Sequence, residues 1–396
     1  MVSRTPLERN ERLSALTGAD IWLKREDLQP VRSYKLRGAY NFIASLTDAE
    51  RASGVVCASA GNHGQGVAYT CRRLGVSCSV VLPRTTPRQK RQRIKALGGD
   101  STTVVVEGHS YEEAHEAALA LAERDGSVLV PPFDHPRVIA GQATVALEIL
   151  EQAERPPDLI IVPVGGGGLV AGTAVTAAGL AQCRVVGVEP AGAASMRAAL
   201  DAGGPVDLES VDSFVDGAAV RRVGGVTFEL VQALVDDVVS VAEGSVCTTM
   251  LELYQSDGII AEPAGALAVA ALAGAVDVPR GSSVVCIVSG GNNDVSRYGE
   301  IVERSLVHEG LKHYFLVEFP QEPGALRGFL DNVLGPTDDI TAFEYVKKNN
   351  RETGPALVGI EVAATEDLAT LLERMKSSGL HIERLPPGSP AFRFLV

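Results

Sequence analysis

The stretch Val31-Arg32-Ser33-Tyr34-Lys35-Leu36-Arg37-Gly38-Ala39 places one lysine directly behind a Ser/Tyr pair, where the pattern predicts the start of a helix. Four further stretches carry glycine, asparagine or serine, the residue types that a small anionic and aromatic ligand needs. They are Ser59-Ala60-Gly61-Asn62-His63-Gly64-Gln65-Gly66, Gly165-Gly166-Gly167-Gly168-Leu169, Glu262-Pro263-Ala264-Gly265-Ala266 and Ser289-Gly290-Gly291-Asn292-Asn293. Together with Lys35 they supply the candidate site residues.

The composition bounds the class of protein. With 396 residues, of which 45% are apolar, the chain is too long for one ordinary core and should form two or three packed units. A net charge of −13 and a pI near 5.1 argue against non-specific nucleic-acid binding and favour a soluble protein.

The cysteines and the lengths of the apolar runs bear on where in the cell the protein is found. Six cysteines are scattered without a C-x-x-C pair, mostly inside apolar runs, which is typical of a reduced cytoplasmic protein and not of a disulfide frame or a zinc site. No run approaches the roughly 20 apolar residues that cross a bilayer, and no apolar stretch follows the N-terminus. We therefore expect a cytoplasmic protein with no membrane partner.

Short β-branched runs alternate with longer helical patterns over most of the chain before Gly310. The expected strands are Val55–Ala58, Ser79–Leu82, Thr102–Val106, Leu159–Val164, Arg184–Val188, Val238–Val241 and Val284–Val288. The expected helices are Asn62–Leu74, Pro87–Leu97, Ser110–Arg124, Val138–Gln152, Leu169–Ala178, Ala261–Ala275 and Ser296–Val307. This alternation predicts the α/β class, with a mostly parallel sheet covered by helices.

The pattern changes near Gly310, where we place a boundary between domains 1–309 and 310–396. The strand-like runs after it are Tyr314–Phe319, Ile340–Lys347 and Ala356–Glu361, the helical ones are Pro323–Val333 and Glu366–Ser378, and a short C-terminal strand follows. This βαββα order with a final strand predicts a small ferredoxin-like α+β domain.

Four consecutive glycines, Gly165 to Gly168, follow an expected buried strand and precede a helix of small residues. Bare backbone amides can approach a phosphate at the positive end of such a helix. The spacing is not G-x-G-x-x-G, and no acidic residue follows a second strand in the register of a dinucleotide site. We therefore expect a single phosphate here and not NAD.

Asn62 follows a strand and a Ser-Ala-Gly turn, an arrangement that directs backbone N–H groups and a helix N-terminus at one point. Such a point binds a carboxylate. The alternative is an ordinary helix N-cap formed by the Asn62 side chain. Similarly, Glu262-Pro263 suits a first helical turn, where the simpler interpretation of Glu262 is capping.

Taken together, these motifs resemble the pyridoxal-phosphate enzymes of the tryptophan-synthase-β class (fold type II). Ser33 to Ala39 matches that family's S-[FY]-K-x-R-G-A motif at every fixed position, and the resemblance extends over roughly Leu7 to Leu306. Within the class the chain looks most like the biosynthetic threonine dehydratases, in a short form with one ACT-like regulatory unit. The resemblance implies two open twisted sheets in the catalytic part.

The resemblance also implies roles for the candidate residues. Lys35 would hold the cofactor covalently and later remove the substrate α-proton, and Ser289 would hydrogen-bond the pyridine nitrogen and favour elimination over transamination. Asn62 would bind the ring hydroxyl. The phosphate would lie on Gly165, Gly166, Gly167, Gly168 and Leu169, and the substrate carboxylate on Ser59, Ala60, Gly61, Asn62 and His63. His63 has a simpler alternative, which is to orient the turn.

Other acidic residues receive no firm assignment. Glu262 lies near the active site of the family without an expected catalytic part. Asp212 and Asp216 could contribute to a cation site of the kind found in some relatives, but their spacing is uninformative, and we assign no metal ligands.

The implied reaction is deamination of L-threonine to 2-oxobutanoate and ammonia, the first step of isoleucine biosynthesis, with feedback inhibition by L-isoleucine through the C-terminal domain. We expect a homo-oligomer, a tetramer or a dimer. Two alternatives stay open: another activity on the same fold, such as serine racemase, catabolic serine/threonine dehydratase or threonine synthase, and a non-catalytic amino-acid sensor. The C-terminal domain argues against the racemase and the catabolic dehydratase, and the intact set of Lys35, Asn62, the glycines and Ser289 argues against the sensor.

Overall fold

The computed structural model describes residues 1–347, 350–392 and 395. The chain divides into two compact units, Met1–Asp294 and Val295–Val396. Helix α13 (Tyr298–His308), which we had placed with the catalytic part, belongs by its contacts to the second unit. The expected boundary between residues 309 and 310 stays a prediction about where the catalytic part ends.

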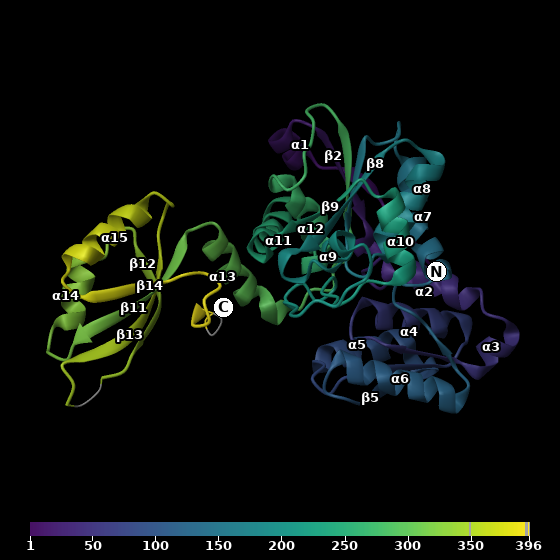
Figure 1. Ribbon diagram of the computed structural model, residues 1–396, viewed down its shortest axis with the longest axis horizontal. Coiled ribbons are helices and arrows are strands. Elements are labelled where there is room, and N and C mark those ends of the chain that lie inside the picture. Colours follow the sequence, from purple (N-terminus) through teal and green to yellow (C-terminus); the bar gives the residue numbers. More distant parts are fainter. Residues whose placement is uncertain (348–349, 393–394, 396) are drawn as a thin grey trace. The chain divides into compact units, whose positions relative to one another are not determined.

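Two separate sheets form the frame of the first unit (Figure 1). The larger has the order β1 (Leu7–Arg9), β2 (Asp20–Arg25), β10 (Ser283–Val288), β7 (Leu159–Pro163), β8 (Arg184–Pro190) and β9 (Asp237–Val241), and only the β1–β2 pair is antiparallel. The smaller is fully parallel, in the order β5 (Thr102–Val106), β4 (Cys78–Leu82), β3 (Val55–Ala58) and β6 (Val128–Leu129). The two open sheets expected from the sequence are confirmed.

Helices connect and cover these strands. They are α1 (Glu11–Thr17), α2 (Lys35–Ala44), α3 (Asp48–Ser53), α4 (Asn62–Leu74), α5 (Arg88–Gly98), α6 (Tyr111–Asp125), α7 (Pro136–Gln152), α8 (Gly168–Leu180), α9 (Ser195–Ala202), α10 (Gly225–Leu234), α11 (Glu243–Asp257) and α12 (Pro263–Ala270). The helix expected over Ala261–Ala275 is shorter, because a 3₁₀ turn at Ala271–Ala273 follows α12.

Helix α2 is held at very short range by α4 and α7. A Cβ on Gly38 would lie 2.3 Å from the Gln142 side chain, and one on Gly141 would lie 2.7 Å from the Gly38 Cα. On another side, a Cβ on Gly66 would be 3.3 Å from the Leu36 backbone. Glycine permits this close approach of helix backbones. The position of Lys35, the first residue of α2, is therefore set by rigid neighbours.

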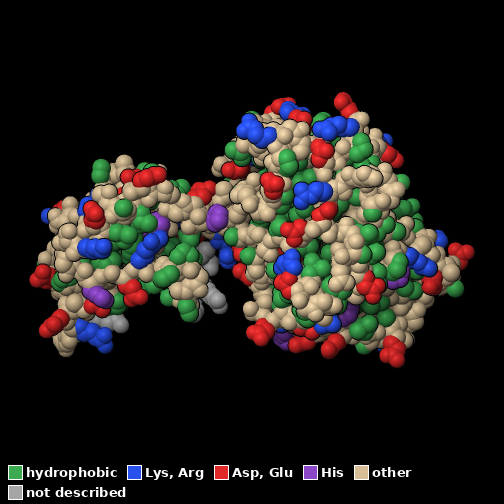
Figure 2. Space-filling view, turned by 45° about the horizontal axis from the view of Figure 1, so that its top comes forward, with side chains coloured by type: hydrophobic (Ala, Val, Ile, Leu, Met, Phe, Trp, Pro, Cys, Tyr) green, Lys and Arg blue, Asp and Glu red, His purple; other side chains and the backbone are tan. Residues whose placement is uncertain are grey.

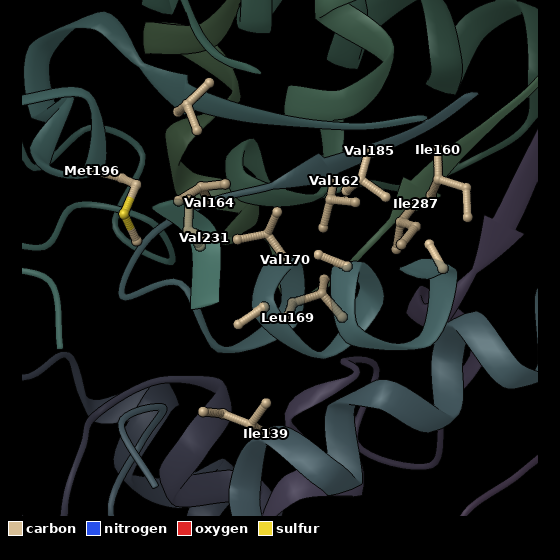
Figure 3. Close-up of a cluster of buried hydrophobic side chains, with 14 of the residues drawn as sticks. Ile139, Ile160, Val162, Val164, Leu169, Val170, Val185, Met196, Val231 and Ile287 are labelled. Carbon is tan, nitrogen blue, oxygen red and sulfur yellow. The ribbon is translucent and has the colours of Figure 1, made fainter. Parts of the chain in front are cut away.

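A large apolar core lies beside the tetraglycine. Val162 and Val164 of the β7 segment pack with Leu169 and Val170 of α8 in one buried cluster (Figure 3). All five residues of β7 are buried, as expected for a strand covered on both faces. Because the strand and the helix are both fixed in the core, the four glycines between them have little freedom.

Besides α13, the described residues of the second unit form a four-stranded antiparallel sheet with two further helices (Figure 1). Its elements are β11 (Lys312–Pro320), α14 (Ala325–Asn332), β12 (Asp339–Tyr345), β13 (Thr353–Glu361), α15 (Asp367–Ser377) and β14 (His381–Leu385), and the strand order is β12-β13-β11-β14. Its core joins strand residues such as Phe315 and Val358 to Phe329 and Leu371 of the helices. The predicted ferredoxin-like domain is confirmed.

The surface carries charges of both signs. On the face shown in Figure 2, acidic and basic side chains are interspersed and form no single extended patch. Across the described residues, none of the helices combines the length and the apolar character that a bilayer crossing requires.

Candidate active site

Lys35 lies at the start of α2 with its amine inside the protein. The Nζ donates a hydrogen bond to the Pro132 carbonyl at 2.9 Å, and it lies 5.5 Å from the centre of the Tyr34 ring and 5.9 Å from that of Phe133. Desolvation lowers the pKa of Lys35 to about 8, against the opposing effect of the Glu262 charge. The amine is therefore much easier to deprotonate than a surface lysine.

Ser289 reaches the same place from the end of β10. Its carbonyl accepts a hydrogen bond from the Tyr34 N–H at 3.1 Å, and Ser33 forms an isolated bridge with Gly290. The Ser289 hydroxyl is buried and donates to the Ala264 carbonyl at 3.2 Å. The turn before Lys35 and the serine that follows β10 are thus joined by their backbones.

Asn62 is the first residue of α4, and the N-cap position belongs to Gly61. The Asn62 Nδ2 donates to Glu262 Oε1 at 2.6 Å, and its Oδ1 accepts from Asn292 Nδ2 at 2.7 Å. The alternative of an N-cap by the Asn62 side chain is therefore wrong. Asn62 instead connects the smaller sheet to two loops of the larger one.

Glu262 has a larger part in the site than the sequence indicated. It occupies the N-cap position of α12, with Pro263 behind it, but its side chain makes no capping hydrogen bond. It is buried, and a Cβ on Gly290 would lie 2.1 Å from its Oε1. Burial, and next the charge of Asp216, raise the pKa of Glu262 to about 7. Only an acidic residue before a helix-starting proline hinted at this contact.

The tetraglycine forms a bare turn at the start of α8. Gly167 has a φ of +91° at the N-cap position, which favours glycine, and Gly168 begins the helix. A Cβ on Gly166 would lie 2.3 Å from the ring of Phe133, the residue after Pro132, whose carbonyl contacts Lys35. The helix N-terminus, the glycine backbone and the lysine amine therefore share one neighbourhood.

The loop Ser59–His63 at the end of β3 is partly exposed up to Asn62. Its Gly61 N–H donates to the Ser59 hydroxyl at 3.3 Å. His63 is buried, with Nε2 2.9 Å from the Val130 carbonyl, and burial lowers its pKa to about 4. His63 is therefore neutral near pH 7, and its contact ties the turn to the segment after β6, while its expected role at the substrate carboxylate stays a prediction.

The remaining acidic candidates have separate partners. Asp216 pairs with Lys90 of α5 at 2.6 Å, and Asp212 accepts from the Phe214 N–H at 2.9 Å. Within the described part of the chain, no group of three His, Cys, Asp or Glu side chains is placed to hold a metal ion.

These residues fit pyridoxal phosphate by their chemistry. Backbone amides at the N-terminus of α8 suit a phosphate, and Gly166 has to be glycine there because a Cβ would collide with the Phe133 ring. A half-buried amine with a lowered pKa suits an aldehyde, and the Ser289 hydroxyl and the Asn62 amide are groups that can hydrogen-bond a pyridine ring. Lys35, Asn62, Ser289 and Gly166 are linked through shared neighbours, and the cofactor contacts expected of them stay predictions.

Comparison with known protein families gives two matches that together cover most of the chain. Residues 1–290 match the family described as pyridoxal-phosphate dependent enzyme, and residues 303–395 match the C-terminal regulatory domain of threonine dehydratase. The biosynthetic L-threonine dehydratase of Mycobacterium tuberculosis is 62% identical over 399 residues, covering 100% of this chain and 93% of the relative. That of Bacillus subtilis is 48% identical, with 100% and 94% covered.

Solved structures resemble the chain over its larger part. The processed form of threonine deaminase isoform 2 from Solanum lycopersicum has a TM-score of 0.73 at 42% identity, covering 77% of this chain and 88% of that one. Maize serine racemase has a TM-score of 0.71 at 32% identity, covering 78% and 94%. The chain therefore belongs to the pyridoxal-phosphate-dependent enzymes, within the family of biosynthetic threonine dehydratases that carry a C-terminal regulatory domain.

Proposed function

We propose that the protein converts L-threonine to 2-oxobutanoate and ammonia by α,β-elimination, with Lys35 and Ser289 as the catalytic residues. The observation that carries this proposal is the half-buried Lys35 amine, which has a lowered pKa, contacts the segment that packs on the tetraglycine turn and follows a residue hydrogen-bonded to Ser289. Membership of the threonine dehydratase family supports the choice of substrate.

Pyridoxal phosphate, when bound, supplies the electron sink that stabilises negative charge at the substrate α-carbon. Lys35 would hold it covalently and, once displaced by the substrate, would take the α-proton. An amine of pKa about 8 is unprotonated in roughly one molecule in ten at pH 7, against about one in three thousand at the ordinary value of 10.5. The lowered pKa thus suits both tasks of Lys35.

Ser289 and the loop Ser59–His63 would orient the reactants. A neutral hydroxyl at the ring nitrogen leaves that nitrogen largely unprotonated, which suits elimination of the β-hydroxyl better than transamination. The start of α4 has no side-chain capping hydrogen bond, and the loop before it is partly exposed. A substrate carboxylate could therefore bind the backbone N–H groups of the first helical turn. Threonine would then be fixed between this loop and Lys35.

The test of the reaction is product analysis with purified protein and pyridoxal phosphate. L-threonine should yield equal amounts of 2-oxobutanoate and ammonia, and L-serine should react more slowly. Because the fold is shared with serine racemase, D-serine should also be measured. D-serine as the main product from L-serine, with no oxo acid from L-threonine, would favour the racemase alternative.

We also propose that L-isoleucine inhibits the enzyme by binding the second unit. An open groove of about 670 Å³ runs between α14 and β12. Its apolar wall includes Leu326, Leu330 and Phe343, and charged side chains of both signs, among them Glu322 and Arg327, line its edge. An aliphatic side chain on a zwitterion matches this combination of surfaces. Inhibition requires that isoleucine bind one of two protein states better than the other.

A point substitution tests the groove without removing the domain. Leu330→Arg should weaken inhibition by isoleucine while leaving uninhibited threonine deamination near the wild-type rate. Leu119→Arg, at a similarly exposed leucine of α6, is the matched control and should leave inhibition unchanged. Equal inhibition of wild type and both variants would place the effector elsewhere. A homo-oligomer and a cytoplasmic location, both expected from the sequence, stay proposals.

A further inference from the structure

Three side chains form a row of hydrogen bonds across the candidate site. Asn292 Nδ2 donates both to the Val31 carbonyl, at 2.8 Å, and to Asn62 Oδ1, at 2.7 Å. Asn62 Nδ2 in turn donates to Glu262 Oε1 at 2.6 Å. The three residues come from the start of α4, the loop after β10 and the residue before α12. The row thus connects both sheets of the first unit.

The groups at the two ends of the row, the Val31 carbonyl and the Glu262 carboxyl, decide which way the amides of Asn292 and Asn62 point. The Val31 carbonyl can only accept, so Asn292 must turn its NH₂ group toward it. That same NH₂ group requires an acceptor from Asn62, which must therefore present its oxygen. The NH₂ of Asn62 is left to face Glu262 Oε1, which accepts its hydrogen bond. The orientation of Asn62 therefore follows from its partners and not from an arbitrary choice between oxygen and nitrogen.

We propose that Glu262 and Asn292 are positioning residues that lock the Asn62 amide with its NH₂ toward the cofactor. An NH₂ group has two hydrogens, and Glu262 takes one of them. The second is free for the ring oxygen of pyridoxal phosphate. This inference rests on the proposed function, because it concerns the residue expected to bind that oxygen.

The surroundings of Glu262 strengthen the lock. Glu262 is buried, the backbone N–H of Asn292 also hydrogen-bonds to it, and Gly290 has no side chain that would displace it. Glu262 therefore receives two donors. A glutamine of the same shape has one accepting oxygen, for which both donors would compete, and its own NH₂ could pair with Asn62 in the flipped orientation. Replacing the carboxylate by an amide should release the lock without opening a cavity.

The test is a double-mutant cycle on the affinity of the apoprotein for pyridoxal phosphate, measured by absorbance titration in the absence of substrate. Glu262→Gln should weaken binding by between about twofold and a hundredfold, the range of coupling found between contacting residues. In the Asn62→Ala background the same change should have almost no further effect, because no amide is left to orient. A structural role for Glu262 would give the same factor in both backgrounds, which would overturn the proposal.

A further variant keeps the test decisive. Asn292→Ala breaks the row at its other end and should weaken cofactor binding only when Asn62 is present, as expected for Glu262→Gln. This variant tests the proposal by itself if Glu262→Gln does not fold. An Asn292→Ala effect that persists without Asn62 would also contradict the lock. None of these titrations depends on threonine turnover, so failure here is distinguishable from failure of the proposed reaction.

Discussion

Helix α2 carries two basic residues, Lys35 and Arg37, whose surroundings are opposite. The Arg37 guanidinium is buried and forms paired hydrogen bonds with Glu26 and with Glu148 at 2.7–2.8 Å. Lys35 has no carboxylate within ion-pair distance in residues 1–347, 350–392 and 395, and it contacts a carbonyl instead. One cation is therefore fully compensated and the other is not.

The difference has a consequence for protonation. The two carboxylates hold the pKa of Arg37 above its ordinary value, although burial alone would lower it. Burial without such a partner lowers the pKa of Lys35 to about 8. Arg37 stays charged and can only stabilise structure, whereas Lys35 can lose its proton and act as a nucleophile or a base. Two positions of one helix thus serve different purposes, with Arg37 stabilising the structure and Lys35 available for chemistry.

The largest effect is expected from Lys35→Ala. Loss of the amine should lower threonine deamination by roughly a hundred- to ten-thousandfold or more, the contribution typical of a positioned acid or base, because no neighbouring amine can replace it. The thermal unfolding temperature should change little. Steady-state assays of 2-oxobutanoate and a melting curve check both parts, and turnover near the wild-type rate would remove Lys35 from the reaction.

Arg37→Met should lower the stability of the protein and should do so without removing the Lys35 amine. Removing Arg37 leaves the buried Glu26 without its cationic partner, although Glu148 keeps Lys24, so the free energy of unfolding should fall by about 3–5 kcal/mol. Urea titration measures this change. The control is Arg12→Met, whose pairs with Glu252 and Asp257 are more exposed and should be worth about 1 kcal/mol or less. Equal losses in the two variants would mean that burial does not distinguish these pairs.

Ser289→Asp would place a carboxylate in the site of Lys35, which has none within ion-pair distance among the described residues. A nearby negative charge should raise protonation of the cofactor ring nitrogen. If the pKa of the ring nitrogen rises by about one unit, its unprotonated fraction falls by roughly tenfold, and the rate of elimination should fall by the same factor. The cofactor should stay bound. Comparing kcat with cofactor content tests this outcome. If elimination kinetics are unchanged, Ser289 does not face the ring nitrogen.

The smallest effect concerns pH. A lysine of pKa about 8 gains neutral amine tenfold for each pH unit up to about 8 and then levels off, whereas one at 10.5 would continue to gain. The rate at which apoprotein binds pyridoxal phosphate should follow this curve. Nα-acetyl-lysine, measured with the same cofactor, corrects for ionisation of the cofactor itself. A rate that still rises tenfold between pH 9 and 10 after this correction would refute the lowered pKa.

Much of the fold and most of the site could be predicted from sequence because their signals are local. Strands such as β3 and β7 are continuous apolar runs, and the tetraglycine follows one of them directly. Strand β2 was not predicted, since its sequence Asp-Ile-Trp-Leu-Lys-Arg contains three charges. Its Lys24 is fully buried and pairs with Glu148 at 2.7 Å, a partner that only the folded chain brings near.

The same limit applies to Glu262. Its contact with Asn62 spans 200 residues of sequence, and nothing local indicates that a glutamate before a helix faces an asparagine amide. The motif around Lys35 could be recognised, but the reason for its low pKa could not, because desolvation comes from Pro132, Phe133 and other segments distant in sequence.

The covalent attachment point is the central claim, and borohydride treatment tests it most directly. Reduction of the protein loaded with pyridoxal phosphate makes the lysine–cofactor bond permanent, and peptide mapping by mass spectrometry then identifies the modified residue. The account predicts one modified lysine, Lys35, with Lys24 and Lys90 unmodified and with no label at Lys35 when the cofactor is omitted. Attachment at another lysine, or no attachment in protein that deaminates threonine, would contradict it.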